Sequence, residues 1–459
     1  MPSTDQTRET CIEQLELWLQ EKAAWVNETV KVKDTLEEGF GLFWTGSSTG
    51  ENELLVQIPQ ENLINLTNVQ EYSLEEPGLF NILNSLKDIK KEELNERETI
   101  TSFLIYERFL RKFSEVSNQK ESPWKPYIDI LPKKSCTPVF YKQQARDWLQ
   151  GTAVGEATEA KIKRLDVEYQ RFLKVLTEEA SLEFEEFAWA DNMYWSRVIS
   201  FQSAVEDSHI ERAGNSDDCH LVPFIDLCNH SLTPSAHWQI TEDGINLVQM
   251  GELLETDTEI HISYGDKPNS ELLYLHGFII PENPYTRYIL PLPLIPDELL
   301  GSKMNFLKAF QIKPQLVLTP EDLVDLTEDT WQLLYLCMVN EEDGFDEDEA
   351  RNLCYRNNPV STVQEIMEIV DALPHYKIIQ LRAVTVLLDV INSALHQLLE
   401  TNPLEGEEVP GELQLVYEYV LTYREEEMDF LENLLQTLSD RQQKLIDNEQ
   451  VQEYLAFNQ

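Results

Sequence analysis

The sequence predicts an α+β protein in which a β-rich unit is interrupted by a helical insertion and followed by an all-helical C-terminal domain. Short segments in which apolar and polar residues alternate lie near residues 36–59 and 226–265, and glycine or proline bounds them. Between about residue 61 and 190, and again after about 290, apolar residues recur with the period of an α-helix. The two halves of the β-rich unit must therefore meet across about 130 residues of sequence.

The chain of 459 residues is long enough for about three domain-sized units. We expect an N-terminal helix at 1–27 and the first part of the β-rich unit at 28–60. The helical insertion should occupy 61–190, and the second part of the β-rich unit, with the candidate site motifs, should occupy 191–290. A helical C-terminal domain at 291–459 is expected to bind a substrate or partner.

The first elements follow from local patterns. Residues 10–27 have apolar positions near one face and acids opposite, which indicates an amphipathic helix. In LEEGFGLFWTG, Gly39 and Gly41 permit a tight turn and a close approach of the backbone to another group. A strand at 53–59 follows and is stopped by its proline. A simple hairpin is the favoured interpretation of these glycines, and a ligand contact is the alternative.

Further on, the segment at 122–141 carries several prolines and aromatic residues and cannot form one helix. Trp124 in it is either the anchor of a docking strap or, as we favour, a core residue. After residue 290, TPEDL at 319–323 has the signature of a helix start. Long helices are expected at 376–399 and from 413 to about 448.

Charge and composition exclude several functions. There are 36 Lys and Arg against 83 Asp and Glu, a formal charge of −47, which argues against nucleic-acid or anionic-membrane binding. A heavily solvated acidic surface is the favoured interpretation of this charge, and attraction of a basic protein substrate or partner is the alternative. No run approaches the roughly 20 apolar residues of a membrane span. The N-terminus lacks a targeting pattern and the six cysteines lack a CxxC motif, so we expect a cytoplasmic and/or nuclear protein. The oligomeric state stays open.

The candidate chemistry lies in two stretches, DLCNHS at 226–231 and ISYGDKPNSELLYLHGF at 262–278. Tyr264 ends an alternating strand beside a glycine, where a hydroxyl could face a cleft. His276 falls at the end of a short helix, and Asp226, Asn229 and His230 form a polar turn after an apolar lead-in. Taken singly, each residue is better explained by packing and internal hydrogen bonds than by ligand binding.

A metal site is the weaker alternative for this region. Six potential ligands fall within nineteen positions: Cys219, His220, Asp226, Cys228, His230 and His237. No pair of them has the CxxC, HxxxH or HExxH spacing of a zinc site. We therefore expect no metal.

The order and spacing of the motifs are more specific than any one of them. EGFG, WSRVIS, NHS and YGDKPNSELLYLHGF, together with WKPYIDILPK and LQGT from the insertion, resemble the SET-domain methyltransferases. More narrowly, the chain is similar to the Rubisco large-subunit lysine methyltransferase type, a SET fold with a helical insert and a helical C-terminal domain. The resemblance covers roughly residues 28 to 290.

The resemblance implies S-adenosylmethionine as cofactor and a protein lysine as methyl acceptor. The cofactor-binding residues would be Glu38, Gly39 and Phe40 in the first turn, with Asn229 and His230. Asp226 and His276 would lie on the substrate side, and Tyr264 would be the catalytic residue at the methyl-transfer centre. The expected substrate is a non-histone protein, and a basic one such as a ribosomal protein suits the acidic chain.

Two positions depart from the family pattern. Family members commonly carry an arginine that grips the cofactor's carboxylate where this chain has Phe201, and Arg197 or Arg212 are candidate substitutes. Many members also have tyrosine where this chain has His276. Two alternatives therefore stay open, a catalytically weak SET-fold module that recruits a basic partner and a protein-histidine methyltransferase, since related proteins include one that methylates actin histidine.

Overall fold

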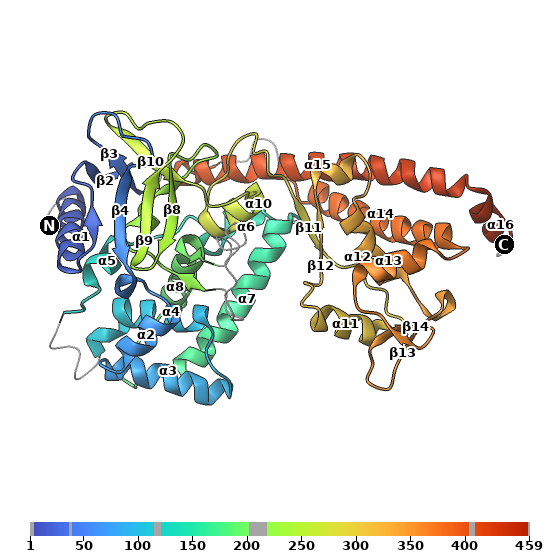
Figure 1. Ribbon diagram of the computed structural model, residues 1–459, viewed down its shortest axis with the longest axis horizontal. Helices are drawn as coiled ribbons and strands as arrows, with labels where there is room; N and C mark the ends of the chain where they lie inside the picture. The colour runs from blue at the N-terminus through green and yellow to red at the C-terminus, as the bar shows by residue number, and fades with distance from the viewer. Residues whose placement is uncertain (1–3, 36–38, 114–120, 202–217, 404–408, 458–459) are drawn as a thin grey trace. The chain divides into compact units, whose positions relative to one another are not determined.

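The computed structural model describes residues 4–35, 39–113, 121–201, 218–403 and 409–457 (Figure 1). Its contacts divide the chain into two units, each of which is built from separate stretches of sequence. Unit 1 consists of Met1–Phe140, Ala160–Asp266 and Leu275–Gly277. Unit 2 consists of Tyr141–Glu159, Lys267–Tyr274 and Phe278–Gln459.

The β-rich unit forms unit 1, and its two halves pair across the helical insertion, as the sequence predicts. Its strands are β1 (Trp25–Val26), β2 (Val30–Asp34), β3 (Phe40–Trp44), β4 (Leu54–Pro59), β5 (Ile199–Ser200), β6 (Cys219–His220), β7 (Asn229–His230), β8 (Ala236–Thr241), β9 (Gly244–Gln249) and β10 (Thr258–Ile262). One sheet has the order β1-β4-β9-β8 and another β2-β3-β10-β7, while β5 pairs with β6. Figure 1 labels β2, β3, β4, β8, β9 and β10 of the two larger sheets.

Pairing between the early and late strands defines the position of the candidate site. β4 pairs antiparallel with β9, and β3 pairs antiparallel with β10, with Leu42 opposite Ile260. The short β7 lies parallel to β10, with His230 opposite Ile262. Apolar side chains at alternate positions of these strands, such as Leu42 and Ile260, are completely buried in the core of unit 1.

Helices provide most of the rest of unit 1: α1 (Thr4–Glu21), α2 (Leu66–Ser73), α3 (Pro77–Lys90), α4 (Glu96–Ile105), α5 (Lys125–Ile130), α7 (Ala153–Leu173) and α8 (Phe184–Arg197). The boundary with unit 2 falls within α7. The helix that we predicted at 10–27 instead ends at Glu21, and Trp25–Val26 pairs with β4. Asn95 and Glu98 form a capping box that fixes the start of α4.

Unit 2 is mainly helical, with α6 (Gln143–Trp148), α10 (Asn269–Glu271), α11 (Leu300–Ala309), α12 (Glu328–Met338), α13 (Val363–Asp371), α14 (Tyr376–Glu400), α15 (Gln414–Ile446) and α16 (Glu449–Phe457). It also contains short strands, β11 (Tyr288–Pro291), β12 (Gln315–Leu318), β13 (Phe345–Glu347), β14 (Leu353–Tyr355) and β15 (Asn358–Pro359). The predicted start at Thr319 is present as a capping box with Asp322, but the helix that follows is a short 3-10 turn.

The long helices α14 and α15 pack along one another (Figure 1) and supply much of the core of unit 2. Among the described residues, α14 is long and apolar enough to cross a membrane, which corrects our expectation that no run would pass such a test. Ala383, Leu387 and Ile391 on this helix are fully buried in the core of unit 2. The core helix of a protein passes the same test of length and composition when it is long and apolar.

Trp124 is a core residue of unit 1. Its side chain is 7% exposed, and its ring lies 5.7 Å from the rings of both Trp18 and Phe103. The indole of Trp18 donates to the carbonyl oxygen of Pro123 at 2.6 Å, which ties α1 to the proline-rich segment. This segment is therefore held by aromatic packing within unit 1.

Replacing Trp124 with alanine should destabilise unit 1 by about 3–5 kcal/mol, because it leaves a large cavity among aromatic rings. The melting temperature should fall by about 10 °C in a thermal unfolding experiment followed by near-UV circular dichroism. Trp25→Ala is the matched control, because that side chain is 45% exposed, and its effect should stay below about 1 kcal/mol. Equal losses for the two variants would contradict a core role for Trp124.

Candidate active site

The segment after β10 contains the predicted catalytic tyrosine and a short helix. Tyr264 lies two residues beyond the end of β10. The helix begins as α10 and continues as the π-helical turn η7 (Leu272–His276), so His276 lies at the end of a short helix, as the sequence predicts, but the last turn of that helix is π-helical. π-Turns of this kind are frequent at functional sites. The wider turn leaves His276 beside Tyr264.

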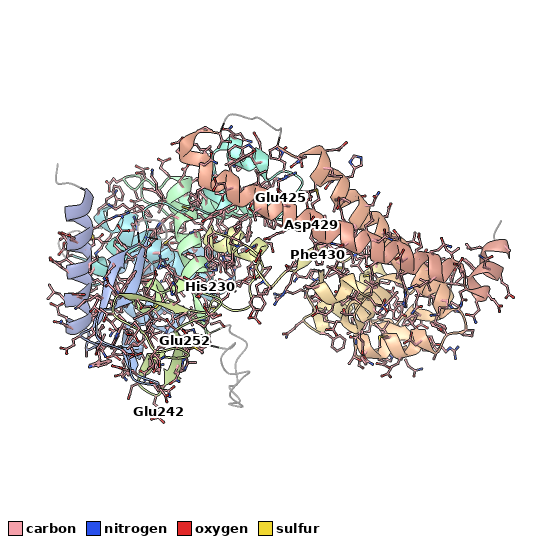
Figure 2. All side chains as sticks on the ribbon, turned by 90° about the horizontal axis from the view of Figure 1, so that it is seen from above. His230, Glu242, Glu252, Glu425, Asp429 and Phe430 are labelled. Carbon is pink, nitrogen blue, oxygen red and sulfur yellow. The ribbon has the colours of Figure 1, made fainter. Side chains whose placement is uncertain are left out.

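Tyr264 lies between two histidine rings. The centre of its ring is 5.1 Å from that of His230, at an interplanar angle of 27°, and 4.8 Å from that of His276, at 31°. The backbone N–H of Tyr264 donates to Nδ1 of His230 at 3.0 Å, and its hydroxyl donates to the carbonyl oxygen of Cys228 at 2.8 Å. The structure thus brings together three of the predicted site residues, Tyr264, His230 and His276, and Figure 2 labels His230.

Asn229 has different partners from its neighbour His230, because successive side chains of a strand point to opposite faces of the sheet. Its amide nitrogen Nδ2 donates to Oε1 of Glu259, on β10, at 2.7 Å. The second carboxylate oxygen of Glu259 is 3.7 Å from Nε2 of His261. We did not predict Glu259 from the sequence, since an acidic residue on a strand has no distinctive pattern.

Asp226 lies in the 3-10 turn η6 (Ile225–Leu227), and its side chain is completely buried. The hydroxyl of Tyr127 donates to its Oδ2 at 2.6 Å, and Nη1 of Arg197 is 3.8 Å from the same oxygen. Its other oxygen, Oδ1, is buried without a hydrogen-bond partner among the described residues. Burial raises the pKa of Asp226 to about 6, and Arg197 and Tyr127 offset a part of that rise.

Tyr127 is a second residue that sequence reasoning missed at this site. It lies on α5, in the proline-rich segment, and is fully buried. Its contact with Asp226 spans 99 positions of sequence, so only the fold could reveal it. In the sequence, Tyr127 is recognisable only as an aromatic residue within WKPYIDIL, and that pattern does not indicate a contact with Asp226.

The structure describes only part of the turn that we predicted to bind the cofactor. Glu38 lies outside the described residues. Gly39 has a φ of +92°, which favours glycine, and no atom of the described residues beyond its chain neighbours lies within 4 Å of the position that a Cβ would occupy. The carbonyl oxygen of Gly39 accepts from the backbone N–H of Thr35 at 2.7 Å, and Phe40, half-buried, begins β3.

Phe201 is buried in an aromatic stack. Its ring lies 3.8 Å from the ring of His220, at an interplanar angle of 20°, and 6.0 Å from that of Trp238. Of the two candidate substitutes for an arginine here, Arg197 is engaged by Asp226, because its Nη1 donates to the backbone carbonyl of that residue at 2.7 Å. Arg212 lies outside the described residues.

The potential metal ligands do not gather at this site. Within the described part of the chain, no three His, Cys, Asp or Glu side chains come close enough to hold a metal ion. His220 is instead bonded through Nδ1 to Asn65 at 3.2 Å and through Nε2 to Asp218 at 2.9 Å.

Unit 2 has a small pocket of its own, with a volume of about 20 Å³, enough for about one water molecule. Tyr288, Tyr423, Glu426, Glu427 and Phe430 are among the residues that line it, and Figure 2 labels Phe430 on α15. Burial raises the pKa of Glu427 to about 7, while its bonds to Tyr423 and to the N–H of Ala153 lower it. Glu427 thereby caps the first turn of α7.

Comparison with known proteins supports the resemblance that the motifs indicate. The chain is 27% identical over 181 residues to ribosomal lysine N-methyltransferase set10 of Schizosaccharomyces pombe, covering 39% of this chain and 32% of that protein. It is 23% identical over 393 residues to SET domain-containing protein 8 of the same yeast, covering 82% and 85%. It is 25% identical over 296 residues to the human actin-histidine N-methyltransferase, covering 62% and 45%. The chain thus spans less than half of the first and third relatives. No protein-family model matches.

Solved structures agree in fold. The SET domain of LSMT, bound to lysine and AdoHcy, aligns with a TM-score of 0.70 and 18% identity, covering 98% of this chain and 96% of the other. Rubisco LSMT bound to AdoMet aligns with a TM-score of 0.68, also at 18% identity, over 96% and 95%. The predicted fold class, a SET fold with a helical insertion and a helical C-terminal region, is therefore confirmed, with the small strands of unit 2 as an addition.

The pKa of Asp226 predicts a pH dependence of stability. Because its folded pKa of about 6 is above the ordinary value of 3.8, the stability that it contributes is complete below about pH 4 and is lost as the pH rises through 6. Asp226→Asn cannot ionise. From pH 4 to 7, the free energy of unfolding of the wild type should therefore fall by about 3 kcal/mol relative to this variant. Urea unfolding at four pH values measures this difference, and parallel pH profiles would contradict the assignment.

Proposed function

We propose that this chain, which has a SET fold and is similar in sequence to protein methyltransferases, transfers a methyl group from S-adenosylmethionine to a lysine side chain of another protein. The observation that carries the proposal is the environment of Tyr264, held between His230 and His276 with its hydroxyl on the carbonyl of Cys228. The arrangement supports a role for this tyrosine oxygen in orienting an attacking amine.

The tyrosine oxygen is suited to accept a hydrogen bond. A hydroxyl has one proton, and Tyr264 donates it to Cys228, so any further hydrogen bond to the oxygen must come from a donor such as an amine. The two flanking histidine rings restrict the tyrosine ring, which keeps the oxygen in place. When bound, S-adenosylmethionine supplies an electrophilic methyl group on a cationic sulfur. Alignment of the amine with that methyl group contributes to the rate without requiring a strong base.

The amine must lose its proton before it attacks. At a pKa of about 10.4, only about 0.1% of a free lysine is neutral at pH 7.4. A buried acceptor channel favours the neutral amine, because desolvation disfavours its charged form. Asp226, with a buried oxygen that has no partner among the described residues, is a candidate contact for the incoming substrate.

Some of the described residues are suited to bind the amino-acid end of the cofactor, and one is not. Asn229 offers an amide oxygen, and Gly39 leaves open space where a side chain would stand. The arginine that the family commonly uses for the carboxylate is replaced by Phe201 in its aromatic stack. We therefore propose that Asn229, His230 and the turn at Gly39 and Phe40 bind the cofactor without an arginine at position 201.

The substrate class follows from charge. A formal charge of −47 attracts basic proteins and speeds their encounter with the chain. Since one relative is a ribosomal lysine methyltransferase, we propose a basic, non-histone protein such as a ribosomal protein, reached in the cytoplasm or nucleus. Methyl-labelled proteomics on cells with and without the protein tests this substrate class.

A histidine acceptor is the second candidate. The relative that methylates actin histidine and the presence of His276 beside Tyr264 support it. The two acceptors differ in product, because acid hydrolysis of a labelled substrate yields methyllysine in one case and methylhistidine in the other. Amino-acid analysis of the hydrolysate separates them.

Tyr264→Phe should reduce methyl transfer to a protein lysate by about 100-fold, because it removes the oxygen that orients the acceptor. Affinity for S-adenosylhomocysteine, measured by calorimetry, should change by less than about threefold. Tyr169→Phe is the matched control, because that hydroxyl also donates to a backbone carbonyl, that of Leu182, at 2.7 Å. Unchanged transfer by the Tyr264 variant would refute the proposed role.

The variant Phe201→Arg distinguishes between two hypotheses, an active enzyme and a catalytically weak binding module. The stack on His220 has no room for a solvated guanidinium, so this variant should lose about 3 kcal/mol of stability and gain no affinity for S-adenosylhomocysteine. Phe201→Leu keeps an apolar side chain at this position and should lose less stability than Phe201→Arg. A tenfold gain in cofactor affinity for the arginine variant would instead indicate a compromised native pocket and favour the binding module.

A further inference from the structure

Four residues from three adjacent strands share one face of the sheet β2-β3-β10-β7. Asn229 on β7 lies opposite His261 on β10, and Phe43 on β3 lies opposite Glu259 on β10. Because side chains alternate along a strand, Glu259 and His261 face the same way, and so do Gly41 and Phe43. Asn229, Glu259, His261 and Gly41 therefore belong to a single face, opposite to that of the buried Leu42 and Ile260.

The contact between Glu259 and Asn229 determines how the asparagine amide is oriented. A carboxylate can only accept hydrogen bonds, so it must face the NH₂ end of the amide. The distance from Asn229 Nδ2 to Glu259 Oε1 is 2.7 Å, typical of a charge-assisted bond. The side chain of Glu259 is 16% exposed, which protects this bond from water. Asn229 therefore presents its oxygen, Oδ1, away from Glu259.

Gly41 makes room for the glutamate. A Cβ at position 41 would lie 2.4 Å from Oε1 of Glu259 and 3.2 Å from Nδ2 of Asn229. Real Cβ atoms do not approach that closely, so any other residue at this position would displace the carboxylate. The backbone of Gly41 is in an ordinary strand conformation, so the requirement for glycine is one of space.

We propose that Glu259, in the space left by Gly41, is a positioning residue that holds the Asn229 amide with its oxygen toward the amino group of the bound cofactor. This inference rests on the proposed function and goes beyond it. The amino-acid end of S-adenosylmethionine carries a carboxylate, which only accepts hydrogen bonds, and an ammonium group, which only donates them. An asparagine oxygen fixed by Glu259 can bond the ammonium group and not the carboxylate.

The first experiment measures binding of S-adenosylhomocysteine to the full-length protein by calorimetry. Glu259→Ala should weaken it about tenfold or more, because the amide loses its fixed orientation. An analogue of this ligand that lacks the α-amino group should bind the wild type and the variant within about twofold of each other. Glu242→Ala, which removes an exposed carboxylate from the same unit (Figure 2), is the control and should leave both affinities unchanged.

The second experiment asks whether Gly41 acts through Glu259. Gly41→Ala alone should weaken binding about as much as Glu259→Ala does, whereas the double variant should bind within about twofold of Glu259→Ala. Glu259→Gln, which keeps an accepting oxygen, should recover part of the affinity. Gly50→Ala is the matched control, because a Cβ there meets only Glu53 at an ordinary 3.6 Å.

A spectroscopic readout tests the hydrogen bond without any ligand. In nuclear magnetic resonance spectra of the protein labelled with ¹⁵N-asparagine, Asn229→Asp identifies the side-chain NH₂ signal of Asn229. One proton of that signal should be shifted downfield in the wild type and should lose the shift in Glu259→Ala and Gly41→Ala. The Gly50→Ala variant should keep it.

The outcomes separate the two proposals. If the wild type fails to bind S-adenosylhomocysteine, the proposed function and this inference both fail. If the wild type binds it and Glu259→Ala binds it equally well, or loses affinity equally for the analogue without the amino group, only the positioning role is overturned. A selective loss for the amino-bearing ligand, with the downfield NH₂ proton lost in the same variants, supports it.

Discussion

The pairing of β3 with β10 is the constraint on which the candidate site depends. These strands come from opposite sides of a long helical insertion, yet Leu42 lies opposite Ile260 and both are completely buried. Register is strongly specified when one face is buried, since a shift by one residue would turn the apolar set toward water. The same register brings Gly41 beside Glu259 and places the end of β10, with Tyr264, next to β7.

One face of this sheet is thus set by hydrophobic burial, and the other carries polar groups that satisfy each other. Asn229 and Glu259 form a hydrogen-bonded pair on the polar face, while His230 turns the other way and accepts from the backbone of Tyr264. Two neighbouring residues of one short strand therefore serve two different parts of the site. Alternation along a strand, rather than proximity in sequence, decides which partner each residue has.

The sequence allowed the strands, the insertion and the group around Tyr264 to be predicted, because alternation and ordered motifs are local signals. Tyr264, His230 and His276 were named from it, and the structure brings them together. The roles assigned to them stay predictions. The short helix that ends at His276 was predicted, but its π-helical last turn was not, since α and π turns differ by one residue per hydrogen bond and no pattern in ELLYLHG separates them.

Other parts of the site could not be predicted because they depend on contacts between distant segments. Tyr127 bonds Asp226 across 99 positions, and the room that Gly41 leaves has meaning only when β10 is beside it. The buried environment of Asp226, which raises its pKa to about 6, likewise arises from packing of several elements. Propensity and spacing contain no information about such contacts until the register of the sheet is known.

Phe201 and Glu259 together suggest how recognition of the cofactor's amino-acid end would be distributed. An arginine at position 201 would bind the carboxylate directly, but the aromatic stack on His220 removes that option, and Arg197 is engaged by Asp226. Under the proposal, the chain contacts the amino group of the cofactor instead, through the Asn229 oxygen. The carboxylate of Glu259 holds that amide in its orientation. An ammonium group near a carboxylate is favoured electrostatically even when an amide stands between them. Under the proposed function, a binding site without an arginine at position 201 can in this way rely on an oriented neutral acceptor.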